Sequence, residues 1–428
     1  MRRIAAGPRA AKLAARHRYG YRRLATAVAG LYLACGLVIP ACDAQNTPIR
    51  SSTAADCREP GVTKDQITLG MLYPDTGNAA SLFLPFRAGV DARLGVANNA
   101  GGINGREVVY TWRDDESRAT ANLAAAHSLV DTDDVFGIIE STSVASGSAA
   151  FLHDRGIPVT GTSLETPWTI YDNMFSYSNL IANGTSISTW GDFVAAHGGH
   201  TAVVAQATFS ATSLSVAAEL TASLRSAGIR VVATLDVTGP IDAADIGGRI
   251  RDSGADVLVG AVTAASFGQV VAAARAARAG LRVILSPTGY DQNVLRLFGT
   301  TLAGVYLFVD YAPFESDTPA HREFLQAVPY YAPQLQPPNQ QAALSGWISA
   351  DMFLRGLADA GPCPTRQRFI TGLRAVHDYD AHGLLPAPVD FTAGFGQLNR
   401  CYTFLQVSSD GKRFQLVPPT PLCGSRLG

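Results

Sequence analysis

Hydrophobic positions near the start of the fold switch from a helical spacing to a strand-like alternation. Five apolar residues recur every three or four positions, which places them on one face of a helix: Phe83, Phe86, Val90, Leu94 and Ala97. The Asn- and Gly-rich stretch 98–105 predicts the end of this helix, because glycine reaches left-handed conformations without a Cβ penalty. Residues 108–112 then alternate in side-chain character, as strands do. This sequence of elements predicts one corner of a βαβ unit.

Similar patterns alternate along most of the chain. A first series predicts strands at 67–73, 108–112, 135–139 and 157–160, and helices at about 86–98, 119–130 and 149–154. A second series predicts strands at 202–205, 231–235, 257–261, 283–285 and 305–309, and helices near 186–196, 214–227, 246–253 and 267–279. Val- and Ile-rich strands separated by helices are typical of parallel sheets covered on both faces. Two series favour two sheets over one.

The segments between and after these series predict how the two sheets are joined. An extended stretch at 174–183 separates the series, and residues 311–338 are rich in proline and tyrosine. Within them the pair Tyr330-Tyr331, flanked by Pro329 and Pro333, is expected to form a packed surface loop, and an aromatic platform for a ligand is the alternative. Residues 340–360 predict a long helix returning to the first lobe, and 402–407 with 414–417 predict a closing hairpin. The predicted fold class is therefore α/β, with two doubly wound lobes. Hinge crossings between the lobes are expected near 178–180, 310–313 and 384–389.

The first 60 residues differ in composition from the rest. Residues 1–41 carry eight Lys or Arg and no acid, and they end in an apolar run at 24–41 that is typical of a signal peptide. Pro40-Ala41-Cys42 resembles a lipobox, whose cysteine is acylated and becomes the mature N-terminus; an ordinary cleavage site is the alternative. Residues 42–60 are expected to be a flexible tether. These features predict an exported protein, lipid-anchored at the extracytoplasmic face of the cell membrane.

The remaining boundaries and the charge balance follow from the same patterns. The first lobe is expected to comprise 61–179 and a return segment at 312–385, and the second lobe 180–311 with a C-terminal hairpin and tail at 386–428. Without the leader the chain keeps 26 basic and 35 acidic residues, a net charge near −9. This charge argues against binding to nucleic acid or to an anionic membrane surface.

Four cysteines remain beyond the leader and Cys42: Cys57, Cys363, Cys401 and Cys423. An even number in an exported chain predicts disulfides, and four cysteines allow three pairings. We favour Cys363–Cys401 together with Cys57–Cys423, because the second bridge would tie the start of the fold to its tail. A metal site is disfavoured, since no CxxC motif or Cys/His cluster occurs.

Sequence motifs for catalysis are missing. No G-x-S-x-G elbow, G-x-G-x-x-G turn or P-loop occurs. Asp114, Asp115 and Glu116 follow a predicted strand and precede a predicted helix, so helix capping is favoured over paired catalytic carboxylates. We therefore predict a binding protein without a cofactor, and not an enzyme.

Two motifs carry a resemblance to a known family. The turn Asn-x-x-Gly-Gly-Ile-Asn-Gly-Arg at 98–106 precedes a strand and Asp114-Asp115, and Gly-Val-Thr-x-x-x-Ile-x-x-Gly stands at 61–70. Over residues 62–410 the chain resembles the type I periplasmic binding proteins, in particular the branched-chain amino acid receptors. The resemblance implies a monomeric substrate-binding lipoprotein of an ABC importer, with permease subunits in the membrane as partners. A ligand-sensing receptor acting through a membrane partner is the alternative.

Candidate ligand contacts are the loops after the strands, because open α/β sheets bind ligands beyond the carboxyl ends of their strands. Loop 140–146 offers hydroxyls and backbone N–H groups that suit a carboxylate, although plain helix capping explains them equally well. The resemblance implies that Thr142 and Ser143 hold the ligand carboxylate. The resemblance further implies contacts at Ser163, Glu165, Phe209, Ser210, Thr263, Ala264 and Thr288, and the strand-end loops add Asp75 and Tyr290.

Position 288 departs from the pattern of the amino-acid receptors, which place a glutamate there for the ligand ammonium group. An ammonium group buried in a closed cleft needs a counter-charge, and Thr288 cannot supply one. Asp75, Glu140, Glu165 or Asp291 would have to replace it. We therefore expect a neutral or anionic small molecule without an α-ammonium group.

Overall fold

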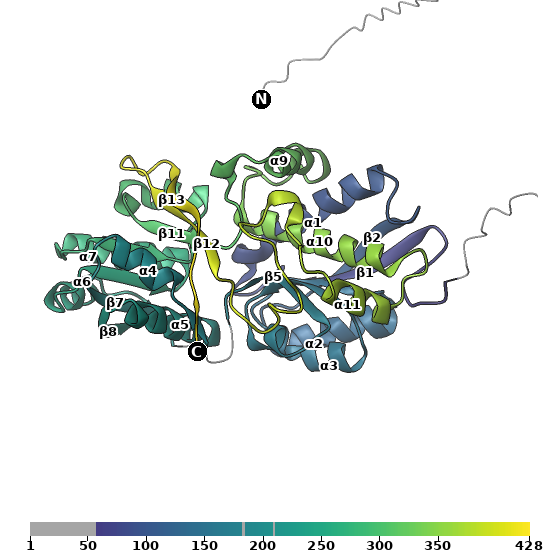
Figure 1. Ribbon diagram of the computed structural model, residues 1–428, viewed down its shortest axis with the longest axis horizontal. Helices are drawn as coiled ribbons and strands as arrows, with labels where there is room; N and C mark the ends of the chain where they lie inside the picture. The colour runs from purple at the N-terminus through teal and green to yellow at the C-terminus, as the bar shows by residue number, and fades with distance from the viewer. Residues whose placement is uncertain (1–56, 182–184, 209) are drawn as a thin grey trace, which may run out of the picture. The chain divides into compact units, whose positions relative to one another are not determined.

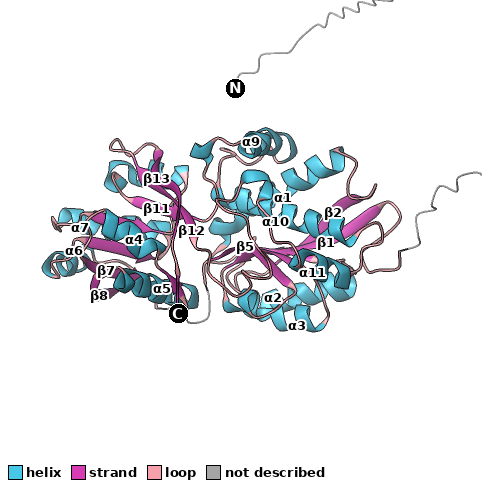
Figure 2. Ribbon diagram, in the orientation of Figure 1, coloured by secondary structure: helices cyan, strands magenta, loops and turns pink. Residues whose placement is uncertain are grey.

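The computed structural model describes residues 57–181, 185–208 and 210–428 (Figure 1). In this range the chain forms two large sheets flanked by helices (Figure 2). The prediction of an α/β fold with two doubly wound sheets is confirmed. The expected leader, Cys42 and nearly all of the expected tether lie outside the described residues.

The first sheet is parallel throughout, in the order β2-β1-β3-β4-β5. Its strands are β1 (Gln66–Tyr73), β2 (Glu107–Asp114), β3 (Ile138–Glu140), β4 (Val159–Ser163) and β5 (Met174–Asn179). The helices of this unit, which we call the first lobe, are α1 (Ala80–Asn99), α2 (Ala119–His127), α3 (Ala149–Asp154), α9 (Pro319–Tyr331), α10 (Gln341–Ala360) and α11 (Arg366–Arg374). Helix α10 is the predicted long helix, and it packs on α1 and on β4.

Helices α1 and α10 meet at very short range. A Cβ added at Gly89 of α1 would lie 1.8 Å from the carbonyl oxygen of Ala343, and one at Gly346 of α10 would lie 2.0 Å from the carbonyl oxygen of Phe86. Only glycine at both positions lets the two backbones come this close. The five apolar positions that predict the inner face of α1 are all buried in this contact region or in the adjoining core.

The second sheet has the order β13-β12-β11-β10-β9-β7-β8 and is parallel from β8 to β11. Its strands are β7 (Thr201–Gln206), β8 (Arg230–Asp236), β9 (Val257–Ala261), β10 (Val283–Ser286), β11 (Tyr306–Val309), β12 (Cys401–Val407) and β13 (Phe414–Cys423). The helices of this second lobe are α4 (Thr189–Ala196), α5 (Ala211–Ser226), α6 (Ala243–Asp252), α7 (Ala264–Ala276) and α8 (Gln292–Phe298). Short strands β6 (Ser186–Ile187) and β14 (Arg426–Leu427) pair separately. The predicted hairpin is β12–β13.

Helix α9 includes Tyr330 and Tyr331, for which the sequence predicts a surface loop. Its first residue is Pro319. A backbone N–H at the first position of a helix has no partner within the helix, so proline loses no hydrogen bond there, and its fixed φ suits the position. Thr318 caps the helix by accepting a hydrogen bond from the backbone N–H of His321 at 3.3 Å. Pro319 therefore begins a helix that also includes Pro329, and the prediction of a loop at Tyr330-Tyr331 is wrong.

Both disulfides join cysteines that the sequence analysis pairs differently. Cys401 bonds to Cys423, because these two residues lie opposite each other in the antiparallel pair β12–β13, with Cα atoms 4.0 Å apart. Cys57 bonds to Cys363, just beyond the end of α10, with Cα atoms 5.3 Å apart. The prediction that all four cysteines form disulfides is confirmed, but the predicted pairing is wrong. Strand β13 extends to Cys423, six residues beyond the predicted end of the hairpin, and this extension creates the Cys401 pair.

The chain crosses between the lobes later in its C-terminal part than the sequence predicts. Val389 forms a bridge with Tyr379, and the ring of Phe391 packs against Phe175 with centroids 5.8 Å apart, so this segment still belongs to the first lobe. Leu398 packs in the core of the second lobe, and Asn399 donates a backbone hydrogen bond to the carbonyl oxygen of Asn179 at 3.4 Å. The third crossing therefore follows residue 396, and its predicted position at 384–389 is wrong.

Candidate functional site

The carboxyl ends of the parallel strands define a candidate site in each lobe. Strand β1 lies between β2 and β3, and β7 lies between β8 and β9. Loops diverge to opposite faces of the sheet at such points, which is where open α/β sheets bind ligands. The structure places the described predicted contacts at or after strand ends: Asp75, Thr142, Ser143, Ser163, Glu165, Ser210, Thr263, Ala264, Thr288 and Tyr290. Phe209 lies outside the described residues.

A hydrogen bond brings the loops of the two lobes together. The hydroxyl of Thr212, in the first turn of α5, donates to the carbonyl oxygen of Leu164 at 2.9 Å. Leu164 stands between Ser163 and Glu165, and Thr212 follows Ser210 by two residues. The predicted contacts after β4 and those after β7 therefore lie close together.

Thr142 and Ser143 follow β3 but differ in how their hydroxyls are used. Thr142 is 1% exposed, and its hydroxyl accepts the backbone N–H of Val144 at 3.2 Å. The half-buried hydroxyl of Ser143 makes no hydrogen bond to the part of the chain that the structure describes. Thr142 therefore shapes the loop, and Ser143 offers a hydroxyl to a ligand.

Asp114 and Asp115 have a structural role that the sequence analysis missed. The N-cap of α2 is Arg118, without a side-chain cap, so the helix-capping interpretation of the acidic run is wrong. Asp114 instead accepts the backbone N–H of Asp75 at 2.9 Å and thereby fixes the loop after β1. Asp115 is fully buried, and it accepts the backbone N–H of Ser117 at 2.8 Å. The sequence signal for this role was a pair of acids at the end of a strand. The loop that Asp114 holds follows the neighbouring strand β1, so the sequence around Asp114 does not reveal the contact.

Four acids could serve as the counter-charge for an ammonium group of a ligand. Three of them already accept hydrogen bonds from the protein. Asp75 accepts the hydroxyl of Tyr73 at 2.7 Å. Glu165 accepts the backbone N–H of Ser146 at 2.8 Å and its hydroxyl at 3.1 Å. Asp291 caps α8 by accepting the backbone N–H of Asn293 at 2.6 Å. These bonds hold the loops, and they draw the carboxylates toward their own lobes.

The fourth acid, Glu140, is buried beneath the same loop. It is fully inaccessible, one oxygen accepts the side-chain N–H of Asn122 at 3.1 Å, and the other has no partner among the described residues. Burial raises the pKa of Glu140 to about 8, and the carboxylates of Asp115 and Glu165 add to the rise, against the bond from Asn122. Glu140 is therefore neutral near pH 7, and it gives this lobe no negative charge at the site.

The predicted contact residues of the second lobe that carry hydroxyls form hydrogen bonds within the second lobe itself. Ser210 caps α5 by accepting the backbone N–H of Ser213 at 3.2 Å, and Thr263 caps α7 by accepting that of Ser266 at 3.2 Å. Thr288 donates to the carbonyl oxygen of Val262 at 2.8 Å. Ala264 begins α7 without a polar group to offer. This edge of the second lobe is therefore preorganised but uncharged at these predicted positions.

Tyr290 packs inside the second lobe. It is 5% exposed, and its hydroxyl donates to Glu315 at 2.5 Å and accepts the backbone N–H of Phe314 at 2.8 Å. Its ring packs on Tyr311 and Phe414. Both hydrogen-bonding roles of the hydroxyl are thus filled by the protein, which makes Tyr290 a support for the site loop.

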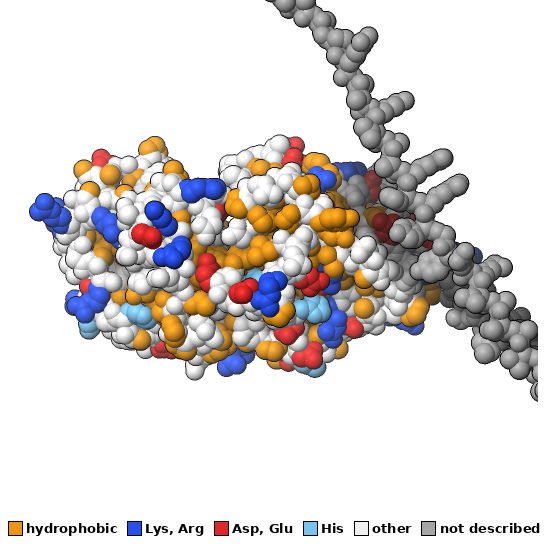
Figure 3. Space-filling view, turned by 90° about the horizontal axis from the view of Figure 1, so that it is seen from above, with side chains coloured by type: hydrophobic (Ala, Val, Ile, Leu, Met, Phe, Trp, Pro, Cys, Tyr) orange, Lys and Arg blue, Asp and Glu red, His pale blue; other side chains and the backbone are white. Residues whose placement is uncertain are grey.

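The described residues carry neither a cluster of metal-ligating side chains nor a helix that could span a membrane. No three metal-ligating side chains gather there. None of the helices in this part of the chain is long and apolar enough to cross a membrane. The face in Figure 3 mixes Lys, Arg, Asp and Glu side chains, without a continuous basic surface on that face.

Sequence comparison identifies the family. Residues 66–412 match the family described as periplasmic binding protein. The chain belongs to this family. Its members are binding proteins, in agreement with the prediction of a binder and not an enzyme. A comparison with curated protein sequences yields no match.

Solved structures of periplasmic binding proteins share the fold. A branched-chain amino acid ABC transporter protein from Thermus thermophilus with bound valine is 17% identical, with a TM-score of 0.70 over 85% of this chain and 97% of that one. A solute-binding protein from R. palustris in complex with benzoate is 16% identical, with a TM-score of 0.68 over 84% and 97%. A fatty acid ABC transporter substrate-binding protein from Thermomonospora curvata is 17% identical, with a TM-score of 0.67 over 84% and 93%. One architecture thus serves ligands with and without an ammonium group.

Proposed function

We propose that the protein is the extracytoplasmic solute-binding component of an ABC importer, and that it binds a small organic molecule between the strand-end loops of its two lobes. Family membership supports the binding role, and structural neighbours include ABC transporter proteins. The hydrogen bond from Thr212 to Leu164 supports a site at these loops, because it joins the two loop sets. The permease subunits of the importer would be its membrane partners.

The proposed motion turns about three chain crossings, at residues 178–180, 310–313 and 397–400. Ser178 at the first crossing donates its hydroxyl to Asp310 at the second, and Asn399 at the third donates its amide N–H to the carbonyl oxygen of Tyr177 at 3.0 Å. These bonds hold the crossings side by side while the lobes pivot. Binding would then favour the arrangement in which both loop sets contact the ligand.

The proposed ligand is a neutral or anionic molecule without an α-ammonium group. The observation that carries this proposal is the state of the four candidate acids: three are bonded to their own loops, and Glu140 is buried and neutral near pH 7. Leaving a buried ammonium without its partner costs about 3–5 kcal/mol, or more than a hundredfold in affinity. Benzoate, bound by the R. palustris neighbour, has no ammonium group.

The acceptor end of the ligand is proposed to lie on Ser143 and on the backbone of loop 140–146. Ser143 has an uncommitted hydroxyl, and the bonds from the backbone N–H groups of Val144 to Thr142 and of Ser146 to Glu165 hold the loop in place before a ligand arrives. Preorganised donors bind an anion without the entropic cost of ordering the loop. The attraction for an anionic ligand would thus come from oriented dipoles and not from a formal cation.

Calorimetry on the purified mature protein tests this proposal. We expect 4-methyl-2-oxopentanoate, benzoate or a related acid to bind more tightly than leucine. Ser143→Ala should weaken binding of that acid by about ten- to a hundredfold, because a hydrogen bond to a charged group contributes about 1.5–3 kcal/mol. Ser425→Ala, at an exposed serine near the C-terminus, is the matched control. Micromolar binding of leucine without binding of its 2-oxo analogue would contradict the proposed ligand class.

The membrane anchor is a separate proposal, resting on the sequence alone. Cys42 follows a small residue at the end of the apolar run, as in a lipobox. Acylation there would hold the binding protein, as a monomer, beside its permease. Mass spectrometry of the N-terminal peptide from the membrane fraction tests the assignment.

A further inference from the structure

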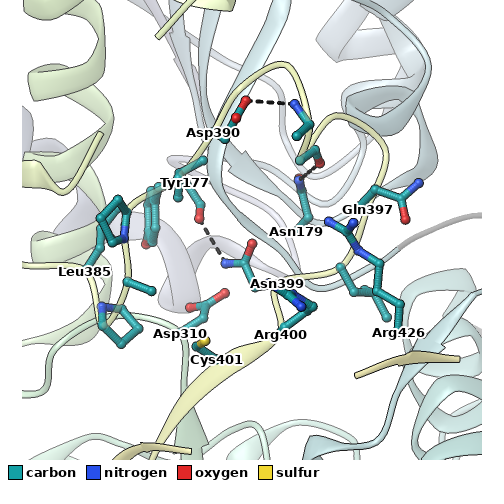
Figure 4. A pocket seen from close by; sticks show the side chains of 17 residues that line it. Tyr177, Asn179, Asp310, Leu385, Asp390, Gln397, Asn399, Arg400, Cys401 and Arg426 are labelled. Carbon is teal, nitrogen blue, oxygen red and sulfur yellow. Dashed lines mark hydrogen bonds between the residues drawn. The ribbon is translucent and has the colours of Figure 1, made fainter. Parts of the chain in front are cut away.

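A cavity of about 250 Å³ lies at the crossings, away from the predicted ligand contacts, none of which lines it (Figure 4). Each of the three crossings contributes to its wall, and so does the C-terminal tail. Its lining residues include Tyr177, Asp310, Leu385, Gln397, Arg400 and Arg426. Because these residues come from both lobes, the cavity is a feature of the hinge.

Asp310 supplies a buried negative charge to this cavity. It is 5% exposed, and the hydroxyl of Ser178 donates to its carboxylate. No cationic group of the described chain forms an ion pair with it. Burial raises the pKa of Asp310 to about 6, against the bond from Ser178, so the group remains mainly ionised near pH 7. A buried carboxylate without a counter-charge is costly, and the cost falls if a cation enters the cavity.

Two arginines on the cavity wall supply positive charge. Arg400 and Arg426 are exposed, and neither forms an ion pair with any described residue. Their backbones are fixed, since the carbonyl oxygen of Arg400 accepts the hydroxyl of Thr189 at 2.7 Å and Arg426 pairs with Ile187. Figure 4 shows both side chains on the side of the cavity opposite Leu385. Guanidinium groups bind carboxylates strongly, by parallel hydrogen bonds.

We propose that the hinge cavity binds a second small molecule, a zwitterion whose ammonium group contacts Asp310 and whose carboxylate contacts Arg400 and Arg426. Leu385 and the prolines beside it provide an apolar wall for the carbon chain between the two charged ends. Gln397 offers a further amide at the arginine side. The ligand class is thus opposite to the one proposed for the strand-end loops, where the candidate acids are either bonded to their own loops or, for Glu140, buried and neutral near pH 7.

Calorimetry with linear amino acids of increasing length tests this site on the purified mature protein. The probes are glycine, 4-aminobutyrate and 6-aminohexanoate, with butyrate and butylamine as analogues that keep one charge only. We expect one of the three zwitterions to bind at least about tenfold more tightly than either analogue. Absence of binding by all three at about 10 mM, the limit of a weak specific site, would overturn the proposal.

Substitutions of the cavity residues test which side chains bind the zwitterion. Asp310→Asn keeps the shape of the side chain and removes its charge, and the double variant Arg400→Gln/Arg426→Gln alters only exposed groups; each should weaken binding at least about tenfold. Arg413→Gln, at an exposed arginine outside the cavity, should leave it unchanged. If Asp310→Asn fails to fold, the double arginine variant decides. Unchanged affinity in that variant, or loss of binding in Ser143→Ala, would place the zwitterion elsewhere and overturn the assignment.

Discussion

Replacing Glu140 by glutamine should change how the stability of the protein depends on pH. The ordinary pKa of 4.5 describes this group in the unfolded chain, whereas burial raises the pKa to about 8 in the folded state. Between these values the folded state holds one proton more than the unfolded state. The free energy of unfolding therefore falls as pH rises, by about 1.4 kcal/mol per pH unit.

The size of the change in stability follows from the difference between the pKa of Glu140 in the unfolded chain and its pKa in the folded protein. The stabilisation is complete below the unfolded pKa and is lost as pH rises toward the folded pKa, a total of about 3–5 kcal/mol. Glu140→Gln keeps the size and the neutral state of the side chain but cannot ionise. The variant should thus match the wild type near pH 5 and exceed it in stability by several kcal/mol near pH 8, an estimate from the same linkage.

Urea unfolding with the disulfides intact, repeated from pH 5 to pH 8, measures the difference between the two proteins. Other titrating groups contribute to both, so the difference isolates Glu140. Glu107→Gln, at an exposed glutamate of β2, is the matched control and should give a flat difference. A flat difference for Glu140→Gln as well would mean that Glu140 is ionised in the folded protein. A counter-charge for an ammonium group would then exist, and the proposed ligand class would lose its support.

Two further predictions concern the anchor and the packing of the first lobe. Cys42→Ala should abolish acylation of the exported protein, and an acyl-free wild-type N-terminus in the membrane fraction would remove the lipobox assignment. Gly89→Ala should lower the free energy of unfolding by at least about 2 kcal/mol, because the new Cβ meets the backbone of Ala343 at 1.8 Å. Gly280→Ala, where a Cβ meets nothing within 4 Å, should change it by less than about 1 kcal/mol, and equal effects in thermal or urea unfolding would refute the packing argument.

The sequence predicts most of the strands and helices because their signals are local. The buried face of α1 follows from the spacing of its own apolar residues, and β9 follows from one short run of apolar residues. Helix α9 was missed because proline disfavours a helix interior but favours its first turn. Pro319 begins this helix, whereas Pro329 lies inside it, two residues before its end.

Pairings between distant residues are harder to predict, because they depend on register and topology. Cys401 meets Cys423 only because β13 runs far enough to bring them opposite each other. Asp114 fixes a loop that follows a different strand, so its own neighbours in sequence do not reveal its role. The neutral state of Glu140 depends on complete burial beneath a loop. The candidate site could be located from strand ends, but the use of each side chain could not.

The order of segments along the chain has a consequence for how the protein folds during export. Helices α10 and α11 cover the first sheet but begin only at Gln341, and β12 and β13 join the second sheet only after residue 400. A chain that emerges with its N-terminus first can therefore complete neither lobe until almost all of it has been delivered. We expect both lobes to mature together in one late step, which keeps the chain in a loosely folded state while it crosses the membrane.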